Sequence, residues 1–138
     1  MTKTLATLIK VHQHELDAQR RVVAELEAVQ ARLVAALEQL QAEMAHEKDV
    51  SQHDAEAAQR WPDYIQYALR REAELKKQIA EFEKQIEQAR ALLQERFAEL
   101  KKFELAKEAS DAEVAASEAR DERLEIDEIA GIRARKDI

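Results

Sequence analysis

The sequence predicts an all-α protein in which two long helices form an antiparallel coiled-coil hairpin, followed by a C-terminal helical overhang. Three observations predict this fold. Two runs of about 39 residues each carry an apolar heptad repeat, and a polar stretch ending at Trp61 and Pro62 separates them. With one Gly, one Pro and 37% charged residues, the composition favours helix over turn. We expect residues 1–138 to form a single coiled-coil domain.

The first heptad repeat predicts a helix over about residues 3–50. Its positions alternate in steps of three and four residues, and nine of the twelve are apolar. An apolar period of about 3.5 residues keeps one narrow seam facing a partner helix. The positions are Leu5, Ile9, His12, Leu16, Gln19, Val23, Leu26, Gln30, Leu33, Leu37, Leu40 and Met44.

The second repeat predicts a helix over about residues 62–130, with ten apolar residues at its twelve positions. The polar seam residues of both runs, such as His12 and Arg96, are expected to set register at some cost in stability. The positions of this second seam are Ile65, Ala68, Glu72, Leu75, Ile79, Phe82, Ile86, Ala89, Leu93, Arg96, Leu100 and Phe103.

The seam is interrupted between Met44 and Trp61, and we expect a bend over about residues 51–61. Pro62 lacks an amide hydrogen and is tolerated in the first turn of a helix, so we expect it to be the first residue of the second helix. Because Trp61 and Ile65 are in phase with the first repeat, phase alone leaves open a single long kinked helix that dimerises. The hairpin is favoured because two seams of matched length can bury each other at little cost in loop closure.

The hairpin predicts which residues of the two helices lie opposite each other, and it leaves the C-terminal residues without a paired helix. If Met44 faces Ile65, paired residue numbers add up to about 109, which places Leu5 near Glu104. Residues beyond about 105 then overhang, with helix-forming sequence as far as Gly131, whose tolerance of the left-handed conformation suits a helix stop. We expect the overhang to dock into a partner, although fraying of the chain end is the alternative.

Composition also limits the chemistry. The chain has no cysteine, and its longest purely apolar stretch, residues 33–37, is too short to span a bilayer, so we expect a soluble cytoplasmic protein. The net charge is −7, of which residues 104–138 carry −5, and no basic stripe suited to nucleic acid is present. No histidine pair with metal-ligand spacing and no glycine-rich phosphate loop occurs. We therefore expect no catalysis, no cofactor and no metal.

Aromatic residues cluster at the start of the second helix. Trp61 falls on the seam and is expected to cover the core at the bend. Tyr64 and Tyr67 lie beside the seam and are expected to be partly exposed, with the composition of an interface hot spot. The alternative is that they only close the bend.

Three stretches resemble the FliJ family of the bacterial flagellar type III export apparatus, which has the injectisome protein YscO as a relative. Residues 8–12 (Leu-Ile-Lys-Val-His), followed by Glu15-Leu16-Asp17, are similar to the family's opening. Residues 60–64 (Arg-Trp-Pro-Asp-Tyr) match its Arg-Trp-x-x-Tyr pattern at the bend. Residues 123–130 (Arg-Leu-Glu-Ile-Asp-Glu-Ile-Ala) resemble its acidic terminal motif.

The resemblance implies a non-enzymatic stalk of the hexameric export ATPase, cytoplasmic and peripheral at the inner membrane, and monomeric in isolation. It also implies contacts with the export-gate membrane protein and with export chaperones. The gate contact would involve Trp61, Tyr64, Tyr67, Arg71 and Gln78; Arg71 and Glu74 depart from the apolar residues common in relatives. A purely structural coiled coil, which dimerises or acts as a scaffold without an ATPase, is the alternative.

The ATPase contact is expected on the overhang, because its apolar residues have no helix in their own chain to pack on. The negative charge of the overhang would suit an ATPase ring whose pore entrance is lined by basic residues. The residues expected to make this contact are Leu124, Asp127, Glu128 and Arg133.

Overall fold

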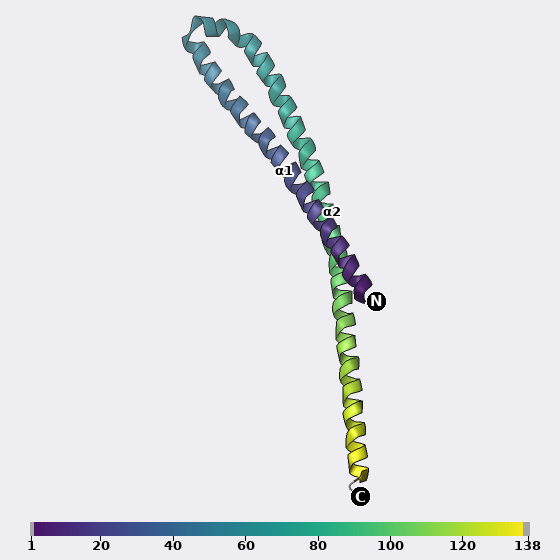
Figure 1. Ribbon diagram of the computed structural model, residues 1–138. Coiled ribbons are helices and arrows are strands. Elements are labelled where there is room, and N and C mark those ends of the chain that lie inside the picture. The colour runs from purple at the N-terminus through teal and green to yellow at the C-terminus, as the bar shows by residue number, and fades with distance from the viewer. Residues whose placement is uncertain (1, 137–138) are drawn as a thin grey trace. The chain divides into compact units, whose positions relative to one another are not determined.

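The structure, a computed structural model, describes residues 2–136 and consists of two helices that pack against each other (Figure 1). Helix α1 spans Thr2–His53 and helix α2 spans Ala55–Lys136. Contacts divide the chain into two units, Asp17–Gln94 and a second unit that contains the residues up to Leu16 and those from Glu95 on. The all-helical fold is confirmed. The overhang and the single domain stay predictions.

The bend is much shorter than the sequence predicts, because Asp54 is the only residue between the two helices in the described range 2–136. Its side chain accepts a hydrogen bond from the backbone amide of Glu56 at 3.0 Å, which is the geometry of an N-cap. Its backbone amide donates to the carbonyl of Val50, also at 3.0 Å, and His53 Nδ1 lies 2.8 Å from the carbonyl of Asp49. Backbone polar groups at the end of α1 and at the start of α2 thus find hydrogen-bond partners around Asp54.

The prediction that helix α2 begins at Pro62 is wrong, since the helix starts seven residues earlier and contains the proline. Proline at this position removes the hydrogen bond to the carbonyl of Ala58. Both residues are exposed, so water can solvate that carbonyl. In Figure 1 the first turns of α2 cross the end of the hairpin before the helix runs back along α1.

Gly131 does not end helix α2, contrary to the prediction. No residue of the described chain has a positive φ, so no left-handed cap forms there. A Cβ at Gly131 would meet only Arg135 Nη2, at 4.0 Å. The helix continues to Lys136, and Arg133, Arg135 and Lys136 in its last turn favour the negative end of the helix dipole.

The unit Asp17–Gln94 is held together by the predicted seam. None of the seam positions in this unit is exposed. Ala68, Leu75 and Ile86 are the most completely buried, with 0%, 1% and 1% of their surface accessible. One core cluster joins Leu40 of α1 to Ala68 and Leu75 of α2. Burial of these side chains supplies most of the driving force for pairing.

Polar seam residues fix the register of this unit. Gln19 Nε2 donates to the carbonyl of Ala89 at 2.9 Å, and Gln30 Nε2 donates to Glu83 Oε2 at 2.7 Å and lies 3.5 Å from the carbonyl of Ile79. The residue numbers add up to 108 for Gln19 with Ala89 and to 109 for Gln30 with Ile79, against the predicted 109. The helices are therefore antiparallel in this unit, as predicted.

The other unit has its own contacts between the helices. Leu16 and Leu100 are buried, and the ring of His12 stacks on Phe103 with centroids 4.7 Å apart. Arg96 Nη1 lies 3.3 Å from Glu15 Oε2. The polar seam residues His12 and Arg96 thus each contact the opposite helix.

Replacement of Ile86 by Ala should lower the free energy of unfolding by about 2–5 kcal/mol, because it removes a fully buried seam side chain. Glu38→Ala, at an exposed position of α1, is the control and should change it by no more than about 0.5 kcal/mol. Denaturant unfolding followed by circular dichroism measures both. Equal losses would refute the assignment of the seam.

Candidate protein-binding surfaces

The residues predicted for the gate contact follow one side of the seam near the bend. Tyr64, Arg71 and Gln78 are seven residues apart, the spacing that keeps side chains on one face of a coiled-coil helix. All three are half-buried. Trp61 is half-buried as well, with its ring centroid 6.0 Å from that of Tyr64. The structure thus brings Trp61, Tyr64 and Arg71 together, with Gln78 farther along the same row.

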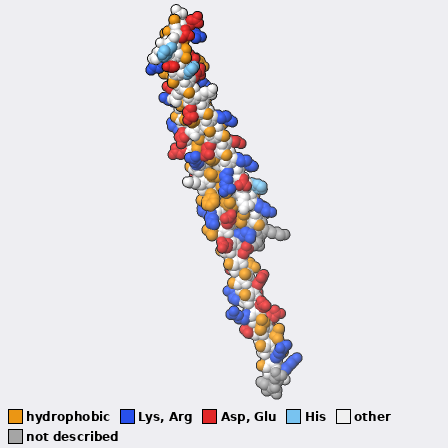
Figure 2. Space-filling model, turned by 90° about the vertical axis from the view of Figure 1, so that its left-hand side faces the viewer, with side chains coloured by type: hydrophobic (Ala, Val, Ile, Leu, Met, Phe, Trp, Pro, Cys, Tyr) orange, Lys and Arg blue, Asp and Glu red, His pale blue; other side chains and the backbone are white. Residues whose placement is uncertain are grey.

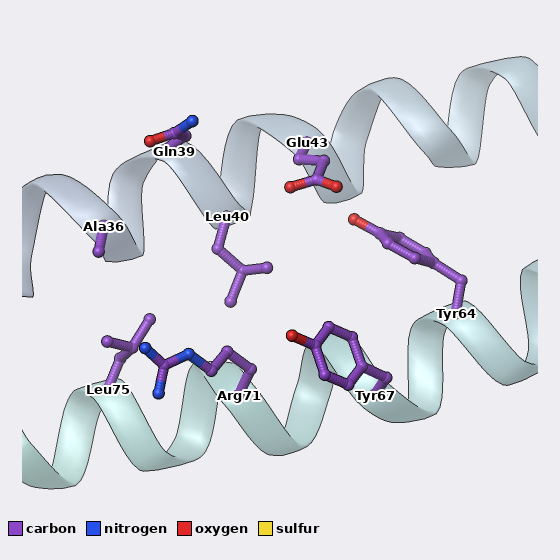
Figure 3. A pocket seen from close by; sticks show the side chains of 8 residues that line it. All are labelled: Ala36, Gln39, Leu40, Glu43, Tyr64, Tyr67, Arg71 and Leu75. Carbon is purple, nitrogen blue, oxygen red and sulfur yellow. The ribbon is translucent and has the colours of Figure 1, made fainter.

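A shallow groove opens between the two helices at this row (Figure 3). Its volume is about 230 Å³, below the roughly 300–1,000 Å³ typical of sites that enclose small molecules. The groove can accept a side chain or a short segment of a protein partner, but it cannot enclose a substrate. Helix α1 contributes Ala36, Gln39, Leu40 and Glu43, and helix α2 contributes Tyr64, Tyr67, Arg71 and Leu75.

Tyr64 belongs largely to the core. Its side chain packs against the cluster of Leu40, Ala68 and Leu75. Its hydroxyl is buried and makes no hydrogen bond that meets the usual geometry within the described residues, although it points toward the carboxylate of Glu43 (Figure 3). Burial raises the pKa of Tyr64, and the negative charges of Glu43 and Glu47 raise this pKa further. Tyr64 is therefore neutral at physiological pH and holds the end of the seam together.

Tyr67 differs from Tyr64, because 64% of its surface is accessible. Its ring lies at the groove with the side chain of Arg71 beside it (Figure 3). Arg71 Nη1 lies 3.6 Å from Glu74 Oε2, within the same helix. An exposed tyrosine beside an arginine is a frequent composition of interface hot spots. Tyr67 is the aromatic residue of this surface that a partner can reach most readily.

The residues that line the α1 side of the groove are not among those predicted from the sequence. Gln39 and Glu43 line it, and Glu43 and Glu47 also border a second hollow with Trp61 and Tyr64. These residues lie off the apolar seam, so periodicity gives them no signal. The predicted register could have identified them, since it places Glu43 opposite Gln66, next to both tyrosines.

The four residues predicted for the ATPase contact are all exposed, but they do not share one face. At about 100° per residue, Leu124, Asp127 and Glu128 lie on one side of α2. Arg133 falls on a different side, with Ile126 and Ile129, whose surfaces are 58% and 48% accessible. A partner that covers Ile126 and Ile129 would meet Arg133, whereas Leu124, Asp127 and Glu128 would face away from it.

Other kinds of site find no support in the described part of the chain. Among residues 2–136, no group of three or more His, Cys, Asp or Glu side chains is placed to hold a metal ion. Nor does either helix, over the described residues, contain a stretch apolar and long enough to cross a membrane. On the face shown in Figure 2, acidic and basic side chains are interspersed along the helices.

Comparison with known protein families gives a match to the model of the flagellar FliJ protein over residues 1–137. The chain belongs to the FliJ family. Membership makes it a component of the flagellar export apparatus and confirms the resemblance inferred from the three sequence stretches. No curated protein and no solved structure matches the chain.

Proposed function

We propose that this FliJ-family chain is a non-enzymatic stalk of the hexameric export ATPase that also contacts the export gate and export chaperones. The observation that carries the proposal is the unequal length of the helices, 52 residues in α1 and 82 in α2. A hairpin of unequal helices has a paired part, which is stable by itself, and a single-helix overhang, which needs a partner. Such a protein acts in the cytoplasm, at the membrane face of the apparatus, and is monomeric in isolation.

The overhang is the part proposed to enter the ATPase ring. Over residues 105–136, the large apolar side chains have 45–67% of their surface accessible. The charge of −5 over residues 104–138 favours a ring entrance lined by basic residues and speeds docking at low salt. The apolar residues are Leu105, Val114, Leu124, Ile126, Ile129 and Ile132.

The bend is proposed to contact the export gate. Tyr67 supplies an exposed aromatic ring, and the groove beside it offers Leu40 and Leu75 at its base with Glu43 and Arg71 in its lining. A partner side chain in this groove would be largely desolvated, a condition under which single residues dominate binding energy.

Tyr67→Ala should weaken binding to the cytoplasmic domain of the export-gate protein by about 2 kcal/mol or more, the threshold of a hot spot, without changing the melting temperature. The reason is that Tyr67 packs little within the chain. Calorimetric titration together with thermal unfolding measures both quantities. Unchanged binding would exclude Tyr67 from the gate contact.

Truncation after Ala109 should leave a folded hairpin that binds the export gate but no longer stimulates ATP hydrolysis by the ring. ATPase activity is titrated with the full-length and truncated proteins at two salt concentrations. Stimulation by the full-length protein should fall as salt rises, because exposed charges are screened. Undiminished stimulation by the truncated protein would place the ring contact elsewhere, with the bend as the next candidate.

A further inference from the structure

The backbone at the bend is close to that of a continuous helix. A continuous helix would form five backbone hydrogen bonds across Asp54, from the amides of residues 54–58 to the carbonyls four residues earlier. Two of these bonds are present, from Asp54 to Val50 and from Ala58 to Asp54, both at 3.0 Å. The amide of Glu56 donates to the Asp54 side chain instead. No residue of the described chain has a positive φ, so the bend needs no left-handed conformation.

The heptad repeat continues through the bend without a change of phase. Its positions between Met44 and Ile65 are Glu47, Ser51, Asp54, Ala58 and Trp61, again in steps of three and four residues. The hairpin leaves part of this repeat unused, because Asp54 and Ala58 are exposed. Ala57, which is not a position of the repeat, is buried there, with 4% of its surface accessible. A helix that continued through Asp54 would bring Ala58 back onto the seam.

The register of the hairpin would also serve a dimer of two continuous helices. Facing residue numbers add up to 108 for Gln19 with Ala89 and to 109 for Gln30 with Ile79. Two antiparallel copies with the same sums would be related by a twofold axis at half of 108 or 109, which is at residue 54 or just after it. Every seam contact of the unit Asp17–Gln94 would then form between two chains, as in a domain-swapped dimer.

Asp54 opposes this dimer in two ways. In the hairpin its Oδ1 accepts a hydrogen bond from the amide of Glu56 at 3.0 Å and caps α2, whereas a continuous helix has no free amide there to cap. In the dimer the Asp54 side chains of the two copies would meet on the seam at the twofold axis. Like charges that face each other on a seam select against that pairing.

We propose that Asp54 keeps the seam within one chain, because it closes the hairpin by capping α2 and disfavours a domain-swapped dimer of the same register. The partner that Asp54 excludes is a second copy of this chain, since a second copy supplies the identical seam residues. The inference concerns the protein by itself and does not rest on the proposed function.

The short connection makes the hairpin the favoured form of the wild type. It gives the two helices an effective concentration for each other on the order of millimolar, so the wild type should stay monomeric at micromolar concentrations. An Asp cap stabilises a helix end about fivefold. Loss of the cap from both chains of a pair should therefore favour the dimer about 25-fold.

The test compares three variants with the wild type. Asp54→Ala removes the cap and the charge, Asp54→Asn keeps a capping side chain, and Asp63→Ala is the matched control at an exposed position off the seam. Each protein is refolded from denaturant over a range of concentrations. Circular dichroism confirms that it is helical, and size-exclusion chromatography with light scattering gives its mass.

Half of the Asp54→Ala protein should reach twice the chain mass of 15.9 kDa at roughly tens of micromolar. The wild type, Asp54→Asn and Asp63→Ala should be monomeric at that concentration. Asp54→Ala protein that is still monomeric about tenfold above it would refute the proposal. Equal dimerisation of Asp54→Asn would refute it too, since the cap would then make no difference, and so would equal dimerisation of Asp63→Ala.

Spin labels distinguish a swapped dimer from two associated hairpins. They are attached to Asp54→Ala protein through Glu27→Cys and Arg90→Cys, at positions whose side chains meet across the two helices. The short distance between the labels should persist in the dimer. Its signal should fall when the labelled protein is refolded with excess unlabelled Asp54→Ala protein, because the seam joins two chains. A signal that survives this mixing would reveal closed hairpins and overturn the proposal.

Discussion

Packing of the apolar seam between α1 and α2 is the interaction on which the rest of the structure depends. An isolated helix of either sequence would expose its apolar row to water, and helices gain most of their stability in proteins from burying such a row. In the unit Asp17–Gln94, Leu40, Ala68 and Leu75 provide this burial, and Gln19 and Gln30 fix the register by donating to carbonyls of the opposite helix. The groove near the bend is formed by residues of α1 and α2 that this register brings together.

The register also explains why the two tyrosines of the bend have different roles. Tyr64 lies next to the seam, in the row that faces α1, so its ring is drawn into the core and the nearby carboxylates of Glu43 and Glu47 raise its pKa. Tyr64 and Tyr67 each precede a seam residue, Ile65 and Ala68, but Tyr67 lies in the row on the outer side of the helix and stays exposed. A difference of three residues in the sequence therefore separates a structural aromatic side chain from one available to a partner.

Much of this fold could be predicted from the sequence because heptad periodicity reports directly on burial. Positions such as Leu75 and Ile86 repeat with the period of the helix and are buried almost completely. The predictions for Pro62 and Gly131 are wrong, because the sequence shows the local preferences of these residues but not what overrides them. Asp54 provides the N-cap earlier in the chain, and the basic residues after Gly131 continue the helix to Lys136.

The candidate sites were predictable only in part. Family-like motifs pointed to the α2 side of the groove, whereas Gln39 and Glu43 belong to the surface only because the helices pair. Such residues carry no local pattern and become visible once the register is known.

The distance between residues 27 and 90 tests most directly whether the seam closes within one chain. Since the chain has no cysteine, spin labels can be attached through Glu27→Cys and Arg90→Cys, at exposed positions whose side chains lie 2.8 Å apart. The hairpin predicts a short distance between the labels, whose signal does not change when the labelled protein is mixed with excess unlabelled protein before refolding. Loss of the signal on dilution would show that the seam joins two chains and would contradict the account.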